Sequence, residues 1–322
     1  MARAWVSMAA CMAACIAALV LSSCASQTPE VLRAPNGLPE RAELIDTPYF
    51  SQQMHQCGPA SLAMALGAAG LDVSPETLEA LVYLPSRQGS LQPEMLAAAR
   101  RHGMLATRIK PRMHALLHEI AQGNPVLVLQ NLGLSWLPQW HYAVVIGYDL
   151  RAREIILRSG PNPREPIAMS TFEHTWSRGG YWGMTVLRPG KLPAEIDLDD
   201  AAQALAALET YARPDQMPDA YRAAIARWPN ALILQIGLGN SLYRLGDLPS
   251  AEAIFRAASD AWPDSAVALN NLASVLQDQG RLPEALAAAD KAAAIVGPWQ
   301  AQASATRDAI RSALGFQTNS EH

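Results

Sequence analysis

The pattern of hydrophobic positions changes near Pro193 and divides the chain into two predicted parts. Between residues 43 and 193, segments with helical spacing are followed by short apolar runs typical of strands. Helices are expected at residues 57–69, from Pro75 onwards with Ser74 as N-cap, and at 92–102; strands are expected at 125–130, 141–146, 154–157 and 183–187. Helices first and strands afterwards predict an α+β fold with helices packed on an antiparallel sheet.

Beyond Pro193 the chain contains alanine- and leucine-rich helical segments and no strand pattern. This part repeats with a period of 34 residues. The matched pairs are Trp228 and Trp262, Pro229 and Pro263, Leu242 and Leu276, Gly246 and Gly280, Leu248 and Leu282, and Ala251 and Ala285. This period, with Gly between paired helices, resembles the tetratricopeptide repeat, and an unrelated amphipathic bundle is the alternative.

The resemblance implies an all-α solenoid over residues 197–298, with two clear repeats at 231–297 and a degenerate one at 197–230. Residues 299–322 are expected to form a capping helix and a disordered tail. Stacked helix pairs create a concave surface, so we expect this part to bind a peptide or a protein partner. The composition predicts two separable domains, of which the first occupies residues 43–193.

The N-terminus combines Arg3 with an uncharged, mostly apolar stretch that extends to about Leu21. This pattern is typical of a secretory signal, and a membrane-spanning anchor is the alternative because the stretch approaches the ~17-residue minimum for spanning. The run Leu-Ser-Ser-Cys24 resembles the bacterial lipobox. That resemblance implies removal of residues 1–23 and lipidation of Cys24.

Ala25, rather than Asp, follows the cysteine of the lipobox. In a Gram-negative host this implies a protein of the cell envelope, anchored by lipid at the periplasmic face of the outer membrane. Residues 24–42 are rich in Ser, Gln, Pro, Asn and Gly with little periodicity, which predicts a flexible tether.

Charge and motifs exclude several classes of function. The 322 residues have a formal net charge of −4 with mixed signs, which argues against nucleic-acid binding. No glycine-rich phosphate loop is present, and we expect no cofactor. His114 and His118 stand four residues apart beside Glu119, but no third ligand follows at an interpretable spacing. A solvated helix face is therefore preferred there, and no metal site is expected.

Of the four cysteines in the chain, Cys57 is the one that we expect to be free to react. Cys11 and Cys15 lie in the predicted signal, and Cys24 is assigned to lipidation, so Cys57 has no disulfide partner. It precedes Gly58 and an apolar helical run, which places the thiol at a helix N-terminus. The helix dipole there favours the thiolate, which is the nucleophilic form.

A nucleophilic thiolate requires a histidine base, and His141 is the best candidate because it opens a predicted strand after a loop. His55 is too near Cys57 in the chain to face it across a cleft. The other five histidines lie on predicted helices, in loops or at the C-terminal end: His102, His114, His118, His174 and His322.

Residues 46–165 resemble the papain-like cysteine peptidases of the bacteriocin-processing, double-glycine leader type. The resemblance rests on Gln52, on Cys57 with the following Gly-Pro-Ala, and on His141-Tyr with a downstream Val-Val-x-Gly. It implies that Cys57 is the nucleophile, His141 the general base, and Gln52 a donor in the oxyanion hole. Gln53 and Gln56 are rivals, because the family usually spaces this Gln one residue further away, where Ser51 stands.

The family usually has a third catalytic residue, an Asp after the strand that follows the histidine. This sequence has no Asp at that position. Asp149 is the nearby acid, but it lies at the far end of the strand that His141 opens, roughly 26 Å away at ~3.3 Å per residue. If Asp149 faces Glu154 across a hairpin, His141 faces about Asn162. Ser159 occupies the aligned Asp position, so Asn162 and Ser159 are both candidates for orienting His141.

The sequence therefore predicts a lipid-anchored cysteine peptidase whose repeats recruit a peptide or protein. Two alternatives are a peptidase-like protein that binds peptides without cleaving them, and a scaffold in which Cys57 is a buried core residue. The absence of a membrane-spanning exporter or ATPase pattern means that the transporter role of the family is not carried over.

Overall fold

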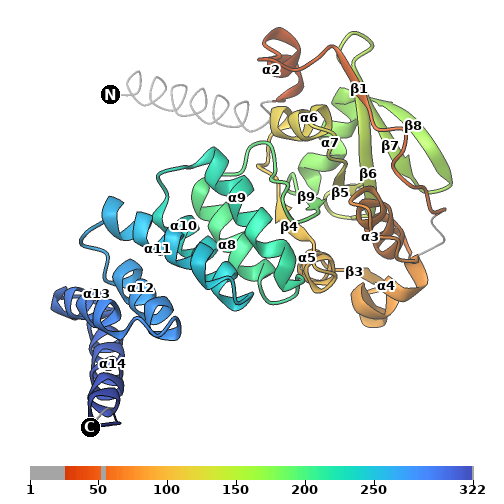
Figure 1. Ribbon diagram of the computed structural model, residues 1–322. Coiled ribbons are helices and arrows are strands. Elements are labelled where there is room, and N and C mark those ends of the chain that lie inside the picture. The colour runs from red at the N-terminus through yellow and green to blue at the C-terminus, as the bar shows by residue number, and fades with distance from the viewer. Residues whose placement is uncertain (1–25, 52–55, 321–322) are drawn as a thin grey trace, which may run out of the picture.

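The computed structural model describes residues 26–51 and 56–320. The chain forms an α/β part, from which an all-helical part projects. The C-terminus lies at the far end of the helical part (Figure 1). The first part contains α2 (Thr28–Arg33), β1 (Arg41–Glu43), α3 (Cys57–Ala68), α4 (Pro75–Val82), β2 (Tyr83–Leu84), the 3₁₀ helix η2 (Pro85–Arg87), β3 (Gly89–Ser90), α5 (Gln92–Arg101), β4 (Leu105–Arg108), α6 (Met113–Ala121), β5 (Val126–Asn131), β6 (Trp140–Asp149), β7 (Glu154–Ser159), β8 (Asn162–Ala168), α7 (Met169–Arg178) and β9 (Gly183–Leu187).

A seven-stranded antiparallel sheet forms the centre of this part, in the order β4-β9-β5-β6-β7-β8, with β1 also paired to β6. Both faces of the sheet are covered. In β5, Val126 and Val128 pack with α6 and α7, whereas Leu127 and Leu129 pack with α3, α4 and α5. Adjacent strand residues point to opposite faces, so an almost continuous apolar run is expected in a strand buried on both sides. The predicted α+β arrangement is confirmed.

The expected helices and strands are present, and Ser74 caps α4 by accepting a hydrogen bond from the Thr77 N–H. The sequence pattern missed the strands β1, β2, β3, β4 and β8. Strand β8 has Pro163 and Pro166 and is mostly exposed at the edge of the sheet. Proline is tolerated at such an edge, where its missing N–H interrupts no ladder, but it removes the strand signal from the sequence.

The predicted flexible tether at residues 24–42 is wrong over the part that the structure describes. Residues Thr28–Arg33 form α2, and Val31 is buried against the α6 side of the core. The Thr28 N–H and the Ser26 hydroxyl both donate to the Glu173 carboxylate on α7. A distant, buried acceptor therefore orders a segment whose own sequence has little periodicity. Residues 1–25, including the predicted signal and Cys24, lie outside the described residues.

The second part is a series of antiparallel helices: α8 (Leu198–Leu208), the short 3₁₀ helix η3 (Pro214–Gln216), α9 (Met217–Arg227), α10 (Leu232–Arg244), α11 (Leu248–Ala261), α12 (Ala266–Asp278), α13 (Leu282–Ala294) and α14 (Gln300–Ser320). The turns within the two clear repeats fall at Gly246 and Gly280, as predicted, with φ of 77° and 76°. Helix α14 continues through Ser320, so the expected tail is helical where it is described.

One hydrophobic cluster crosses the boundary between the two parts. Leu105 of β4 and Leu187 of β9 belong to the same cluster as Leu205 and Leu208 of α8. The first helix pair therefore covers the outer strand of the sheet, which would otherwise expose apolar side chains.

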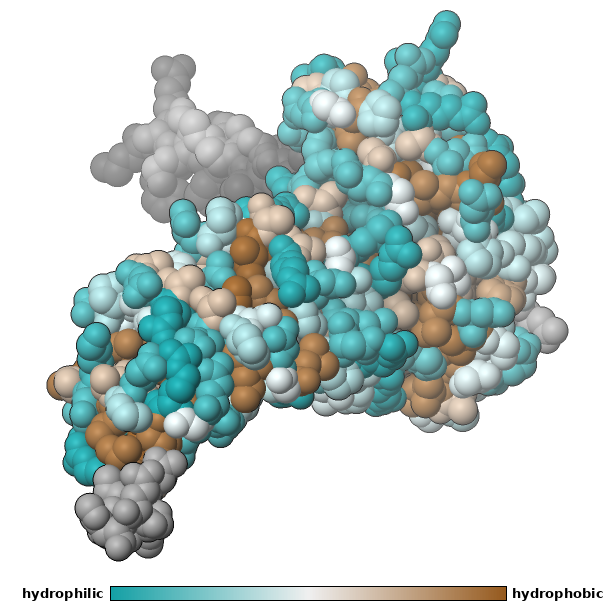
Figure 2. Space-filling view, in the orientation of Figure 1, coloured by the Kyte–Doolittle hydropathy of each residue, from teal (hydrophilic) through white to brown (hydrophobic). Residues whose placement is uncertain are grey.

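The visible surface is mostly hydrophilic, and its apolar patches are scattered (Figure 2). Among the described residues, no helix combines the length and the apolar character needed to cross a membrane.

Candidate active site

Cys57 is the first residue of α3 and is half-buried. The preceding Gln56 has a non-helical backbone, with φ −103° and ψ 13°, so the helix begins at the cysteine. Gly58 permits the close approach of β3, because a Cβ atom at this position would lie 2.3 Å from the Ser90 Oγ. The required glycine thus fixes the start of α3, and with it the thiol, against the β2–β3 hairpin.

His141 is the second residue of β6, where it pairs with Gln130 of β5. The ladder between β6 and β7 runs from Asp149 and Glu154 to Val144 and Arg158. Beyond this ladder, the backbone of Tyr142 forms a hydrogen bond with the Cys57 sulfur. The structure therefore places the thiol beside the strand residue that directly follows His141.

Ser159 at the end of β7 is the partner of the imidazole: His141 Nε2 lies 2.9 Å from Ser159 Oγ. The loop that follows Ser159 is held by the Tyr49 hydroxyl, which donates to the Gly160 carbonyl at 3.1 Å, and by Arg158, which donates to the Pro163 carbonyl at 2.7 Å. Both contacts restrict the backbone on which Ser159 stands.

The other candidates for the orienting role lie elsewhere. Asn162 is exposed at the start of β8 and pairs through its backbone with Ser159. Asp149 faces Glu154, as the sequence predicts, and accepts a hydrogen bond from the Ala152 N–H in the turn. Asp149 therefore belongs to the hairpin turn at the opposite end of β6 from His141.

The expectation that His141 faces about Asn162 is wrong, because β6 contains a bulge between Val145 and Gly147 and Asn162 belongs to β8, where it pairs with Ser159. A Cβ atom at Gly147 would lie 2.8 Å from the Ala42 carbonyl oxygen, so glycine admits the close approach of β1 at this point. The bulge shifts the register of β6 against β7 by one position, and β7 ends at Ser159, whose hydroxyl lies at His141 Nε2.

Burial shifts the pKa values of both the Cys57 thiol and the His141 imidazole. It raises the pKa of the Cys57 thiol above its ordinary value of 9.0, against hydrogen bonds from the backbones of Tyr142, Gly58 and Cys57 itself. Burial also lowers the pKa of His141 below 6.5, and the charge of Glu165 opposes this shift. The sequence-based expectation of a preformed thiolate is therefore corrected: burial favours the neutral form of the Cys57 thiol and the neutral form of the His141 imidazole.

The proposed oxyanion-hole donors are only partly described. Gln52 and its rival Gln53 lie outside the described residues. Gln56 is described, and its side-chain amide donates to the Glu79 carboxylate of α4 at 3.1 Å. The side chain of Gln56 is therefore engaged with α4 in this structure.

The sequence predicts only a loop before His141, whereas the structure shows an apolar hairpin there. The connection between β5 and β6 exposes the side chains of Leu132, Leu134, Trp136, Leu137 and Trp140, with Trp136 78% exposed. The buried Asn131 orders this connection, because its Oδ1 accepts hydrogen bonds from the N–H groups of Gly133 and Gln139. The hairpin thus presents an ordered apolar surface beside the candidate base.

A group with metal-ligating composition lies on the opposite side of the sheet from α3. His114 and His118 of α6 face Glu195, which precedes α8. Their side chains are 28% and 34% exposed, so the expected solvated helix face is instead partly covered by the connector to the repeats.

Comparisons with known proteins agree with this architecture. Residues 44–184 match the model of the peptidase C39 like family, and residues 219–266 and 236–298 match the tetratricopeptide repeat. The chain therefore combines a peptidase C39-like domain with tetratricopeptide repeats. No curated protein matches the chain.

Solved structures resemble each part of the chain separately. A protein described as a C39-like peptidase from Bacillus anthracis is 17% identical, with 47% of this chain and 98% of that chain covered and a TM-score of 0.40. The peptidase domain of Streptococcus ComA, a bifunctional ABC transporter of a quorum-sensing pathway, is 20% identical, with coverage of 44% and 96% and a TM-score of 0.36. The Yersinia enterocolitica type III secretion chaperone SycD, in complex with a peptide of the translocator YopD, is 14% identical, with coverage of 35% and 92% and a TM-score of 0.33.

Proposed function

We propose that the protein is a cysteine peptidase that cleaves a peptide or protein through a thioester on Cys57. The observation that carries this proposal is the convergence of three elements: the start of α3 places the thiol beside β6, and His141 of β6 is held by Ser159 of β7. A nucleophile, a base and a group that orients the base are the minimum set for acyl transfer by a thiol.

The proposed mechanism starts with a neutral Cys57 thiol and a neutral His141 imidazole. In the tautomer that carries its proton on Nε2, His141 donates to Ser159 Oγ, and Nδ1 is then the proton acceptor. As the sulfur attacks the substrate carbonyl carbon, Nδ1 takes the thiol proton and later gives it to the leaving amine. Water, deprotonated by the same nitrogen, then hydrolyses the thioester and restores the thiol.

The oxyanion formed in both steps requires N–H donors. The family resemblance assigns this role to the backbone N–H of Cys57 and to the side chain of Gln52. Such donors act mainly on the transition state, so their loss is expected to lower kcat more than substrate affinity.

The apolar hairpin at residues 132–140 supports a preference for substrates with large apolar side chains near the cleaved bond. Its exposed Trp136 and Trp140 follow an ordered turn and directly precede His141 in the chain. Burying one such side chain against the hairpin contributes about 1.5–3 kcal/mol, enough for marked selectivity.

The repeats and the N-terminus suggest where the peptidase works. Tetratricopeptide repeats are protein-interaction modules, and we assign them the recruitment of the substrate or of a protein partner. The Leu-Ser-Ser-Cys24 run supports lipid anchoring in the cell envelope, at the periplasmic face of the outer membrane. The N-terminal mass of the native protein tests this: a lipidated Cys24 is expected, and an unmodified Cys24 or a retained Met1 contradicts it.

A second candidate function is peptide binding without cleavage. It is favoured by the raised pKa of the Cys57 thiol and by a serine, rather than a carboxylate, beside His141. A hydroxyl orients an imidazole but does not stabilise the imidazolium as a carboxylate does.

A peptide-library assay separates the two functions. The purified full chain is incubated with mixed peptides, and mass spectrometry identifies new termini. A peptidase yields products that contain apolar residues near the cut and that disappear in Cys57→Ala and His141→Ala. If no products form while the wild type and Cys57→Ala bind the same peptides equally, peptide binding is the function.

A further inference from the structure

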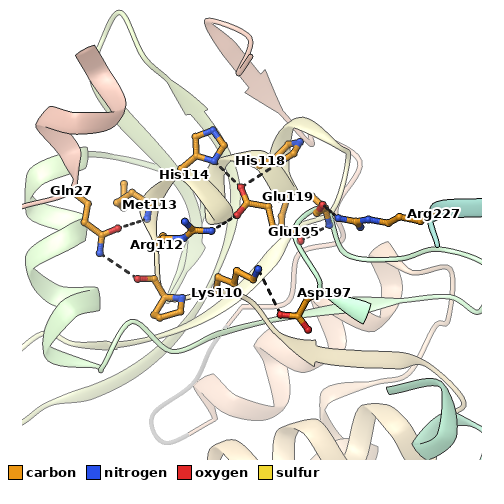
Figure 3. A network of polar contacts seen from close by, with 12 residues as sticks. Gln27, Lys110, Arg112, Met113, His114, His118, Glu119, Glu195, Asp197 and Arg227 are labelled. Carbon is orange, nitrogen blue, oxygen red and sulfur yellow. Dashed lines mark hydrogen bonds and ion pairs between the residues drawn. The ribbon is translucent and has the colours of Figure 1, made fainter. Parts of the chain in front are cut away.

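Three side chains with ligand atoms for transition metals converge between α6 and the connector that precedes α8 (Figure 3). His114 and His118 lie one helical turn apart, so α6 presents both imidazoles on one face. Glu195 reaches them from a position 81 residues beyond His114 in the chain. Its Oε1 lies 2.7 Å from His114 Nδ1 and 3.5 Å from His118 Nδ1.

The two oxygens of the Glu195 carboxylate have separate partners. Arg112 donates to Oε2 at 2.8 Å, whereas Oε1 faces the two imidazoles (Figure 3). An outer partner of this kind fixes the orientation of a metal-ligating carboxylate. Arg112 therefore leaves one oxygen directed at the space between the histidines.

The backbone that carries Glu195 is fixed from both sides. The neighbouring Ala194 N–H donates to the buried carboxylate of Glu119 on α6 at 2.8 Å. From the repeats, Arg227 donates to the carbonyl oxygens of Pro193 and Ala194 (Figure 3). Glu195 is thus held by contacts other than those with the two histidines, as a preorganised ligand requires.

Hydrogen bonding does not satisfy the imidazoles. His118 Nδ1 and His114 Nε2 are buried and make no well-formed hydrogen bond among the described residues; the facing oxygen of His118 Nδ1 is Glu195 Oε1 at 3.5 Å. Buried polar atoms in native proteins are usually paired, so each orphan requires an explanation. An ion between the imidazoles and Oε1 explains the His118 nitrogen directly, because Nδ1 is the atom that faces Glu195.

We propose that His114, His118 and Glu195 bind a Zn²⁺ ion. Two imidazole nitrogens and one carboxylate oxygen are typical zinc ligands, with bonds of about 2.0–2.2 Å. Tetrahedral ligands at such distances are roughly 3.3 Å apart, which is near the 3.5 Å between His118 Nδ1 and Oε1. The 2.7 Å contact of His114 widens slightly when the ion replaces the proton between these atoms.

Water completes the coordination. His114 and Glu195 line a pocket of about 320 Å³, together with Gln27 and Arg112. This pocket provides an entry path for the ion and space for a fourth ligand.

The ion would clamp the connector of the repeats onto the peptidase domain. Glu195 stands between β9 and α8, whereas both histidines belong to α6. Because α6 and α3 pack on opposite faces of the sheet, the zinc site is separate from Cys57 and its chemistry. Zinc binding is therefore expected to stabilise the arrangement of the two parts without entering the cleavage reaction.

Metal binding to the purified full chain tests the proposal. After dialysis against micromolar Zn²⁺, one bound ion per chain is expected by elemental analysis. Loss of even an outer partner of a ligand weakens metal affinity about 10–100-fold, so His118→Ala and Glu195→Gln should weaken it by about 100-fold or more. Retention of wild-type affinity in either folded variant overturns the proposal, as does the absence of bound zinc in the wild type.

Two controls separate this site from other ligands. His174→Ala removes an exposed histidine of α7, and Cys57→Ala removes the free thiol; both should bind zinc as the wild type does. Added Zn²⁺ should raise the thermal unfolding midpoint of the wild type and of both controls, but not of His118→Ala. A zinc affinity that falls in Cys57→Ala but not in His118→Ala places the ion at the thiol and contradicts the assignment.

Replacing the ligand Glu195 by cysteine provides a spectroscopic test of metal binding. In the Cys57→Ala background, Glu195→Cys exchanges the carboxylate for a thiolate, a softer ligand that still binds zinc-like ions. With Co²⁺ as the probe, this variant should show a sulfur-to-metal charge-transfer band that the parent lacks. If Co²⁺ binds and no such band appears, Glu195 is not a ligand.

Discussion

His141 Nε2 lies 2.9 Å from Ser159 Oγ, where two strands of the sheet diverge beyond their last paired residues. In the tautomer with the proton on Nε2, this contact leaves the second imidazole nitrogen unprotonated, as the proposed base requires. In the proposed mechanism the orienting group is therefore a neutral hydroxyl, which stabilises the charged imidazolium less than a carboxylate does.

The first prediction concerns this contact. Ser159→Ala is expected to lower kcat about tenfold, since one neutral hydrogen bond contributes about 0.5–1.5 kcal/mol. Ser159→Asp should raise the pKa of His141 and move the acidic limb of the pH–rate profile to higher pH. Peptide-cleavage kinetics check both effects.

Asn162→Ala and Asp149→Asn are the matched controls for the first prediction, and both should retain nearly full turnover. Asn162 is exposed on β8, and Asp149 lies in the hairpin turn. A large loss of kcat in Asp149→Asn, with Ser159→Ala unaffected, contradicts the observed register.

The second prediction is a pH dependence. Because burial raises the pKa of the Cys57 thiol above 9.0, the thiolate forms only as the pH rises through that higher value. Alkylation of Cys57 by iodoacetamide should therefore be slow near neutral pH and accelerate above pH 9.0. A fast, pH-independent rate between about pH 5 and 7 would instead reveal a preformed thiolate–imidazolium pair, as found for low-pKa cysteines.

The pKa of His141 determines the acidic limb of the pH–rate profile of cleavage. Its lowered pKa keeps the imidazole neutral at pH 6.5, so the base is lost only as the pH falls through a value below 6.5. Cleavage rates measured at decreasing pH should therefore decline below 6.5. A decline centred above 6.5 contradicts the effect of burial on His141.

The third prediction concerns the repeats. Gly246 and Gly280 adopt positive φ, so replacement of either by Val is expected to cost about 1–3 kcal/mol of unfolding free energy. Gly297→Val is the control, because a Cβ added there also meets no atom within 4 Å, but Gly297 is not among the glycines with positive φ. Urea unfolding compares the three variants, and equal losses in all of them would show that backbone conformation is not the cause.

The fourth prediction follows from the cluster shared by both parts. Leu205 is buried on α8 against the cluster that includes Leu105 and Leu187. Leu205→Ala should cost about 2–5 kcal/mol. A chain that ends at residue 193 should unfold at lower urea than one that ends at residue 230, because only the longer chain covers β4. Equal midpoints would show that the two parts are independent, as the composition alone predicts.

The sequence predicts features that depend on neighbouring residues. The Ser74 cap, the glycine turns of the repeats and the start of α3 at Cys57 each follow from local backbone preferences. The 34-residue repetition also defines the helix pairs, since stacked repeats must present the same side chains at each interface.

Features set by distant contacts are not predictable from the same pattern. The bulge beside Gly147, where the close approach of Ala42 requires glycine, shifts the register of β6 against β7 by one position. Glu195 meets His118 through a connector whose position depends on Glu119 and the repeats. Burial likewise outweighs the local preference of a helix N-terminus for the Cys57 thiolate.

The central claim is that Cys57 carries the acyl group and that His141 delivers and removes its proton. Intact-mass spectrometry of the full chain, quenched with acid during reaction with an activated ester of an apolar peptide, tests it directly. The wild type should gain the acyl mass on Cys57 and lose it within the turnover time, whereas His141→Ala should acylate much more slowly and Cys57→Ala not at all. An unmodified Cys57 in the wild type, or equal acylation in His141→Ala, would contradict the account.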